Sequence, residues 1–411
     1  MKNRMPNVTS ALWKPVSPAT KQIATFERDI AANALCININ SERFGVGKWI
    51  SEVPIEPGKS YDFSVTAESG CHVNDLYVII TTFRADGSMI IREHAHCHET
   101  LENGYRFLHK VEAGKDSVKL SIELWLKGYQ GSVSWHVPLL TDGEALQARN
   151  VGIAVAYIPP KAANAYTLES NTADILEALE ESAKHHPDII LLGEAMYTRG
   201  TGLPLSVTAQ TDDGAMCRLM AQKATEYNTY IVYNLHELDD GEYYNTSILF
   251  DRQGKIVGKY RKTHLTVTEL ELGMTPGTEH PVFDTDFGKV GMLVCYDHYF
   301  SKPVEQVAAN GAEILLISSA GDAAEQCFAR AKDCGLYVAV CGWNTENSYG
   351  WAPGRIIDAN GNMLSGTREK GKPAFAKIDL NKPVRRHWLS LGNADMEIHS
   401  VYKYEKNVHC K

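Results

Sequence analysis

Two hydrophobic patterns divide this chain near residue 150. Residues 30–140 contain short runs in which apolar and polar side chains alternate, such as YDFSVTAES and VKLSIELWLKG. Turn sequences such as ADG and GYQGS separate these runs, and segments of helical period are scarce. Because alternation with a period of two indicates strands with one buried face, the first part of the chain is predicted to form an all-β sandwich.

Beyond residue 150, apolar strand-like runs alternate with segments of helical period. VGIAVAYI and PDIILLG are typical of buried strands, and the amphipathic segment NTADILEALEESAKHH between them predicts a helix capped by Asn171 or Thr172. Such alternation is typical of an α/β layered domain. We therefore expect a β-sandwich domain over residues 1–145 and an α/β domain over residues 150–411.

Composition narrows the class of protein further. A chain of 411 residues is longer than one hydrophobic core usually serves, which agrees with two domains. The formal net charge of -9 and the lack of a basic stripe argue against a nucleic-acid partner. No apolar window has the length of a membrane span, no secretory signal is recognisable, and the nine cysteines show no CxxC spacing. We predict a cytoplasmic protein with reduced thiols and no membrane partner.

Three segments of the second part end on reactive side chains. Glu194 follows the apolar run DIILLG, Lys262 follows a predicted hairpin, and Cys295 ends GKVGMLVC. Because the carboxyl ends of strands in an α/β sheet form one rim, these side chains can converge although they are far apart in sequence. A thiol nucleophile, a carboxylate base and a cation that stabilises an oxyanion are suited to covalent hydrolysis. A nearby ammonium group would also lower the pKa of the thiol.

Each of the three residues also has an ordinary structural interpretation. A cysteine at the end of an apolar strand is usually a small core residue. Lys262 lies in the basic run KYRKTH, of a kind found at solvated edges, and Glu194 can mark the exit of a strand. Composition and periodicity alone therefore leave both interpretations open.

Together, the three segments resemble the catalytic blocks of the nitrilase superfamily, the carbon-nitrogen hydrolases. The matching sequences are DIILLGEAMYTRG, YNTSILFDRQGKIVGKYRKTHL and FGKVGMLVCYDHYF. The resemblance covers roughly residues 150 to 380 and implies a Glu-Lys-Cys triad of Glu194, Lys262 and Cys295. It also implies a four-layer αββα fold, assembly into a homodimer or higher homo-oligomer, and catalysis with no metal or organic cofactor.

Further site residues follow from the resemblance. A second glutamate near the lysine commonly positions the substrate in this family, and Glu269 occupies that place, with Glu271 as the alternative. The backbone N–H of Tyr296, directly after the expected nucleophile, is placed to donate to the oxyanion. Asp297 is expected to be structural, with contact to a polar substrate as the alternative.

The expected activity is hydrolysis of a non-peptide C-N bond in a small linear amide or N-carbamoyl compound, through an acyl-enzyme. The sequence CYD at Cys295 differs from the Cys-Trp-Glu usual in true nitrilases, which favours these substrates over nitriles. The loop FSKPVEQ departs from the family's Phe-Pro-Glu, so the shape of the pocket is not predicted. The alternatives are hydrolysis of a nitrile by the same triad and a non-catalytic glycan-binding protein.

The first domain resembles the jelly-roll domains related to carbohydrate-binding modules, through GKWISEVPIEPGKSYDFSV and GSVSWHVPLL. We expect it to restrict the hydrolase pocket or to mediate assembly. In the alternative, Trp125 or Trp135 stacks on a carbohydrate. His94, His96 and His98 would share one face of a strand and are candidate metal ligands. A polar strand face explains them as well, no carboxylate pair or CxxC completes a site, and we predict no bound metal.

Overall fold

The computed structural model describes residues 2–7, 9–95, 97–136, 138–321, 324–343 and 352–382, and the backbone of residues 385–387 and 395–397. The chain divides into two compact units. The first contains the described residues up to 147 together with the two short C-terminal strands, and the second contains residues 148–382. Among the described residues, no helix is long and apolar enough to cross a membrane.

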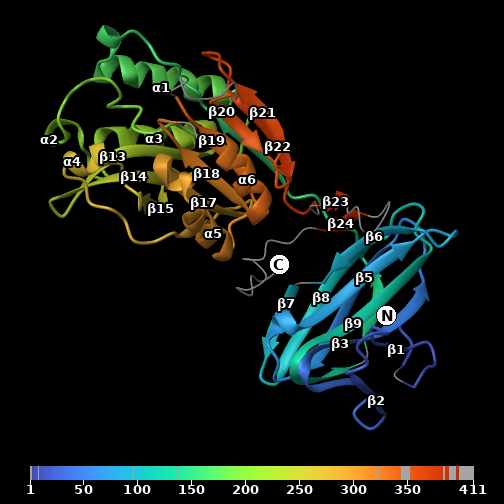
Figure 1. The fold of residues 1–411 in the computed structure, drawn as a ribbon. Coiled ribbons are helices and arrows are strands. Elements are labelled where there is room, and N and C mark those ends of the chain that lie inside the picture. Colours follow the sequence, from blue (N-terminus) through green and yellow to red (C-terminus); the bar gives the residue numbers. More distant parts are fainter. Residues whose placement is uncertain are drawn as a thin grey trace. The chain divides into compact units, whose positions relative to one another are not determined.

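The first unit is built almost wholly of antiparallel strands (Figure 1). Its strands are β1 (Lys14–Val16), β2 (Thr25–Asp29), β3 (Ala34–Pro54), β4 (Ser60–Glu68), β5 (Leu76–Phe83), β6 (Met89–His94), β7 (Cys97–Leu101), β8 (Gly104–Glu112), β9 (Lys119–His136), β10 (Leu139–Gly143), β23 (Arg385–His387) and β24 (Asp395–Glu397). Strands β3 and β9 are long and pair along most of their length. The all-β prediction agrees with these strands, and the jelly-roll topology stays a prediction.

The C-terminal strands belong to the first unit's sheet. β24 pairs in parallel with β6, through Asp395 opposite Ile91, and antiparallel with β23. The chain thus returns to the first unit after the second one is complete. The expected boundaries of 1–145 and 150–411 remain a prediction.

The structure corrects two expectations about the first unit. Trp135 is fully buried in the core between the strands, so its ring is not available to stack on a carbohydrate. His94 ends β6 whereas His98 lies on β7, so these histidines do not share one face of a single strand, and His96 lies outside the described residues. Both described histidine rings pack against aromatic neighbours, His94 on Tyr77 and His98 on Tyr105.

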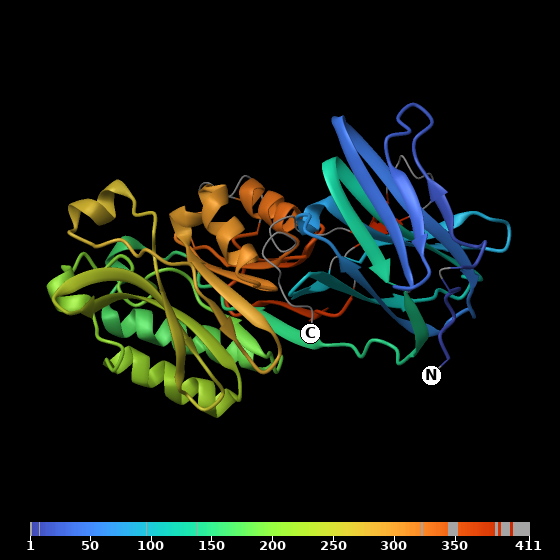
Figure 2. The ribbon, with the colours of Figure 1, turned by 90° about the horizontal axis from the view of Figure 1, so that it is seen from below.

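The second unit contains two six-stranded sheets (Figures 1 and 2). One consists of β15 (Ile256–Arg261), β14 (Glu242–Phe250), β13 (Tyr230–Asp239), β12 (Ile189–Leu191), β11 (Asn150–Val155) and β22 (Ala374–Asp379), in that order. The other consists of β16 (Val282–Asp284), β17 (Lys289–Val294), β18 (Ile314–Ser318), β19 (Tyr337–Cys341), β20 (Gly354–Ile357) and β21 (Met363–Thr367). In each sheet three central strands are parallel and the outer strands are antiparallel.

Helices cover both sheets. The longer ones are α1 (Leu168–Ala183), α3 (Ala215–Tyr227), α5 (Ser301–Ala309) and α6 (Ala324–Cys334), and α2 (Leu205–Thr208) and α4 (Val267–Glu271) are short. Helices α1 and α3 share one apolar core with β11, β12 and β13, whereas α5 and α6 pack with the β17–β20 sheet. The result is a layered order of helix, sheet, sheet and helix.

The strand sequences explain this layering. In β11, Ile153 packs between the two sheets, while Ala154 packs toward the helices on the other face. Strands buried on both faces are apolar at successive positions, as VGIAVAYI and DIILLG are. The first helix begins earlier than expected, because Thr167 rather than Asn171 or Thr172 caps it, through a capping box with Ser170.

We predict that the core between the two sheets dominates the stability of the second unit. Met292 on β17 is fully buried there, so Met292→Ala should lower the free energy of unfolding by about 2–5 kcal/mol. Met363 on β21 is 44% exposed and provides a matched control, whose change to Ala should cost no more than about 0.5 kcal/mol. Urea denaturation of the full chain measures both values. Equal effects of the two substitutions would contradict this assignment of the core.

Candidate active site

A lysine held between two glutamates forms the centre of the candidate site. Lys262 follows β15 and is 1% exposed, and its Nζ lies 3.0 Å from Oε1 of Glu194. The same Nζ lies 2.9 Å from Oε1 and 2.8 Å from Oε2 of Glu269. Burial alone would lower the pKa of Lys262, but the negative charges around it raise that pKa, so the ammonium group stays charged.

Of the two candidates for the second glutamate, only Glu269 reaches this centre. Glu269 is 8% exposed and lies on the inner side of α4, whereas Glu271 is exposed to solvent. The Glu269 carboxylate also accepts hydrogen bonds from the backbone N–H and the hydroxyl of Thr266, at 2.8 and 2.9 Å, as part of the capping box of α4. The helix terminus and the site therefore share one carboxylate. Although burial opposes it, Lys262 lowers the pKa of Glu269.

Glu194 lies on a turn directly after β12. Oε2 of Glu194 accepts a hydrogen bond from the backbone N–H of Ala320 at 2.7 Å, and Oε1 accepts one from Nδ2 of Asn245 at 2.8 Å. The next residue, Ala195, has a φ of 49°, in the region that favours glycine. Its N–H donates to Oδ1 of Asn234 at 2.8 Å, which holds the turn in this conformation.

Cys295 follows β17 and also has a left-handed backbone, with a φ of 42°. Backbone strain at a non-glycine residue persists only where surrounding contacts fix it, and it is common at functional sites. The charges of Glu194 and Lys262 both act on the Cys295 thiol, which places all three expected triad residues in one neighbourhood.

The charge state of Cys295 differs from the expectation. Burial raises the pKa of the thiol to about 12, and the negative charge of Glu194 raises it as well. Lys262 lowers that pKa, as do hydrogen bonds involving Gly321 and Ser319, but these effects are smaller. The resting side chain is therefore a thiol near neutral pH, and it needs a base to become a nucleophile.

Asp297 ties the turn that carries Cys295 to the segment that carries Lys262. Asp297 is fully buried, and Oδ2 accepts hydrogen bonds from the backbone N–H of Val294 at 3.0 Å and from the hydroxyl of Tyr260 at 2.8 Å. Oδ1 accepts from the backbone N–H of His264 at 2.9 Å. Because these contacts occupy both carboxylate oxygens, the geometry supports the structural role expected for Asp297.

Tyr296 lies at the exposed side of the same turn. Its side chain is 37% exposed, and its ring packs against Phe300 with 5.1 Å between the ring centroids. The stacked ring of His264 covers Phe300 from another side, at 4.6 Å. The rings of Tyr296, Phe300 and His264 thus form an aromatic cluster at the turn that carries Cys295. The role of the Tyr296 backbone N–H stays a prediction.

Several further residues complete the site. Asn245 on β14 is buried and contacts both glutamates, but in the sequence it lies in the polar stretch NTS, which no apolar run marks as buried. Ala320 contributes a backbone N–H after β18, which no side-chain pattern marks. Trp343 donates from Nε1 to the backbone oxygen of Glu194 at 3.0 Å, and the guanidinium of Arg199 lies over the Trp343 ring at 5.1 Å.

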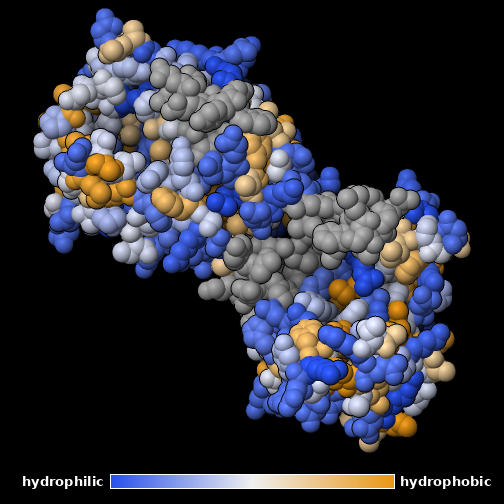
Figure 3. Space-filling view, in the orientation of Figure 1, coloured by the Kyte–Doolittle hydropathy of each residue, from blue (hydrophilic) through white to orange (hydrophobic). Residues whose placement is uncertain are grey.

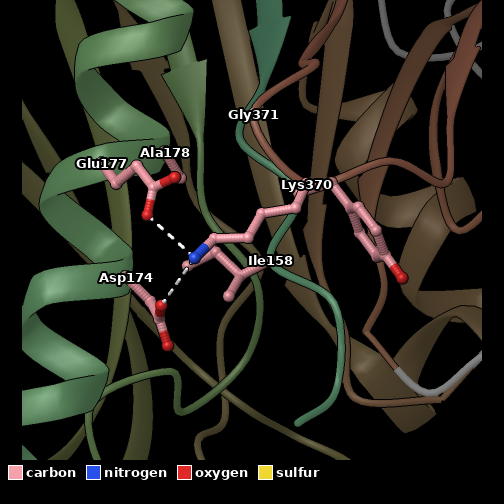
Figure 4. A pocket seen from close by; sticks show the side chains of 7 residues that line it. Ile158, Asp174, Glu177, Ala178, Lys370 and Gly371 are labelled. Atoms are coloured by element: carbon pink, nitrogen blue, oxygen red, sulfur yellow. Dashed lines mark hydrogen bonds and ion pairs between the residues drawn. The ribbon is translucent and has the colours of Figure 1, made fainter.

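A small surface pocket elsewhere in the second unit has no part in this constellation. It is lined by Tyr157, Ile158, Asp174, Glu177, Ala178, Lys370 and Gly371 (Figure 4). The Lys370 side chain extends across it and pairs with Glu177 at 2.9 Å and Asp174 at 3.4 Å, so its polar groups satisfy one another. Within the described part of the chain, no three His, Cys, Asp or Glu side chains are grouped to hold a metal ion.

The surface around α4 is apolar. Val267, Leu270 and Leu272 are exposed by 71%, 57% and 51%, and hydrophobic residues gather around α4 in the space-filling view (Figure 3). Glu269 points inward from the same helix, so α4 presents apolar side chains to solvent and a carboxylate to the site.

Comparison with known proteins identifies the family. The sequence model of the carbon-nitrogen hydrolases matches residues 152–383, more than half of the chain. The chain therefore belongs to the carbon-nitrogen hydrolases of the nitrilase superfamily, a family of enzymes.

Individual relatives are distant. The chain is 26% identical over 264 residues to Hydrolase C26A3.11 of Schizosaccharomyces pombe, covering 56% of this chain and 82% of that protein. It is 29% identical over 215 residues to 2-oxoglutaramate amidase of Bacillus subtilis, covering 49% of this chain and 82% of that protein. The crystal structure of Saccharomyces cerevisiae Nit3, a member of branch 10 of the nitrilase superfamily, matches with a TM-score of 0.47 and 22% identity, over 58% of this chain and 92% of that chain.

The raised pKa of Cys295 predicts its reactivity. Alkylation by iodoacetamide should be slow at neutral pH and should accelerate about ten-fold per pH unit, without a plateau below about pH 10. In Glu194→Gln the negative charge that raises the thiol pKa is absent, so Cys295 should react faster than in the unsubstituted enzyme at pH 8. Mass spectrometry of the Cys295 peptide measures both rates. A plateau near pH 7 in the unsubstituted enzyme, or slower alkylation of Glu194→Gln, would contradict this charge assignment.

Proposed function

We propose that the enzyme hydrolyses a small linear amide or N-carbamoyl compound through an acyl-enzyme on Cys295. The observation that carries the proposal is the buried pair of Glu194 and Lys262, 3.0 Å apart, whose charges both act on the Cys295 thiol. This pair supplies a base and a fixed positive charge beside a nucleophile, which are the groups that acyl transfer needs.

In the first half of the reaction, Sγ of Cys295 attacks the carbonyl carbon and Glu194 accepts the thiol proton. The carbonyl oxygen gains negative charge, which the Lys262 ammonium and the Tyr296 backbone N–H stabilise. When the C-N bond breaks, Glu194 returns the proton to the leaving nitrogen, so ammonia or an amine departs and a thioester remains. The buried carboxylate thus serves as base and then as acid.

In the second half, a water molecule attacks the thioester carbon. Glu194 accepts a proton from the water, and Lys262 stabilises the second oxyanion. Collapse releases the carboxylic acid, and Glu194 returns the proton to the Cys295 sulfur. A thiol with a pKa of about 12 is compatible with this cycle, because the proton moves to Glu194 only as the new bond forms.

The substrate class rests on the relatives and on the sequence next to the nucleophile. Several relatives are named as amidases, which favours an amide, and CYD at Cys295 departs from the pattern of true nitrilases. Hydrolysis of a nitrile by the same residues is the second candidate, because a thiol also adds to a nitrile carbon. We further propose a cytoplasmic homodimer or higher homo-oligomer that acts on a small molecule.

A glycan partner of the first unit has weaker support than the hydrolase activity proposed for the second unit. Of the two tryptophans considered for stacking, Trp125 is half-buried, and the Lys48 ammonium lies 4.4 Å from its ring centroid. Its Nε1 donates to Glu123 at 2.9 Å. One face of the ring is thus occupied by a cation, and we favour a role of the first unit in assembly or in restricting the pocket.

Replacing the nucleophile tests the proposal. Cys295→Ala should reduce hydrolysis by about 10⁴-fold or more, because no other group can form the acyl intermediate. Cys71→Ala, at a half-buried cysteine of the first unit, is the matched control and should keep full activity. The assay is the release of acid from a panel of linear amides, N-carbamoyl amino acids and nitriles. Undiminished hydrolysis by Cys295→Ala would exclude the proposed mechanism.

A further inference from the structure

We propose that Asn245 is a positioning residue that gives the two glutamates of the site different roles. Its Nδ2 donates to Oε1 of Glu194 at 2.8 Å and to Oε1 of Glu269 at 2.6 Å. One neutral amide thereby holds two carboxylates that both face Lys262. The inference rests on the proposed function, because the role assigned to Glu194 is that of the base.

The orientation of the Asn245 amide follows from the network around it. The backbone N–H of Ala195 can only donate, so the Asn234 atom that it contacts at 2.8 Å must be the oxygen. The Asn234 amide nitrogen then donates to Oδ1 of Asn245 at 2.9 Å. The Asn245 NH2 group must therefore face the carboxylates. The chain of contacts begins at the residue after Glu194 and ends on the Glu194 side chain, so it fixes both the turn and the carboxylate.

The two carboxylates differ in how many hydrogen bonds they accept from the described residues. Glu269 accepts from Asn245, from both the N–H and the hydroxyl of Thr266, and at both oxygens from Lys262. A carboxylate offers about four lone-pair sites, so Glu269 has no position left for a proton.

Glu194 has an acceptor position left. Its Oε1 accepts from Asn245 and Lys262, but its Oε2 accepts one hydrogen bond from the described residues, that of the Ala320 N–H. Oε2 therefore keeps a lone pair that can take the proton of the Cys295 thiol. The structure assigns proton transfer to Oε2 of Glu194 and a fixed electrostatic role to Glu269.

A neutral bridge is required at position 245 because of the charge around it. The groups that face Asn245 are Glu194, Glu269 and Lys262, together with His236, which is its partner across β13 and β14. Burial lowers the pKa of His236, so that ring is neutral near pH 7 and adds no positive charge. A third carboxylate here would face two others with a single ammonium group between them.

The test compares Asn245→Asp with Asn245→Ala on an amide that the unsubstituted enzyme hydrolyses. Asn245→Asp has nearly the same volume but loses the NH2 donor, and kcat should fall about 100-fold while KM changes less than about three-fold. Two neighbouring carboxylates raise the pKa of the new Asp, and only its protonated form can donate to a glutamate. Activity of Asn245→Asp should therefore recover as the pH falls, whereas that of Asn245→Ala should not.

Two further variants separate positioning from general damage. Asn234→Asp still accepts from Ala195 but no longer donates to Asn245, so it should lower kcat in the same way, and its effect should not add to that of Asn245→Ala. Asn310→Asp makes the same chemical change at a surface amide that contacts the His280 backbone, and it should keep full activity. An unchanged kcat in Asn245→Asp, or equal pH profiles for Asn245→Asp and Asn245→Ala, would overturn the inference.

Failure of the proposed function would be visible separately, as a lack of hydrolysis by the unsubstituted enzyme. In that case the alkylation rate of Cys295 by iodoacetamide still tests the bridge. At pH 9, Asn245→Asp should react about ten-fold more slowly than the unsubstituted enzyme, which corresponds to one pKa unit in the thiol, and Asn310→Asp should react at the unsubstituted rate. Equal rates in all three proteins would overturn the inference.

Discussion

The second unit depends on one buried charge, the ammonium group of Lys262. A buried lysine is tolerated only where counter-charges and hydrogen bonds replace water, and here two carboxylates do so at 2.8 to 3.0 Å. This requirement fixes the positions of Glu194 and Glu269, and with them the turn after β12 and the N-terminus of α4. The Cys295 thiol lies in the same electrostatic field, so its pKa reflects the balance between burial, Glu194 and Lys262.

The sheets bring these groups together because they place the ends of several strands at one rim. Glu194 follows β12, Cys295 follows β17, and Ala320 follows β18. Strands β17 and β18 are parallel neighbours, and β12 packs across from them in the other sheet. Strands β12, β17 and β18 are apolar between their ends, so their polar groups lie at or beyond the ends. The buried amides of Asn234 and Asn245 lie within β13 and β14 instead. The same apolar packing that stabilises the unit therefore excludes water from the charges.

Much of this arrangement could be predicted from the sequence, for physical reasons. The alternation in residues 30–140 indicated an all-β unit, and the continuous apolar runs after residue 150 indicated strands buried on both faces. Resemblance placed Glu194, Lys262 and Cys295 together, although periodicity could not, because each has an ordinary role at a strand end.

Other features depend on tertiary contacts and could not be predicted. The burial of Trp135, the division of the histidine run between β6 and β7, and the high pKa of Cys295 follow from packing that a local pattern does not encode. The bridge made by Asn245 belongs to the same class, since its partners are 51 and 24 residues away along the chain.

The central claim is that Cys295 carries the acyl group while the buried carboxylate and ammonium groups remain unmodified. Mass spectrometry of the enzyme, quenched with acid during exposure to a mixed amide library, tests it most directly. An added acyl mass is expected on the peptide that contains Cys295, and none on the peptides that contain Glu194 or Lys262. Consumption of an amide with the acyl mass on another residue, or with no acyl mass on Cys295 under rapid quenching, would contradict it.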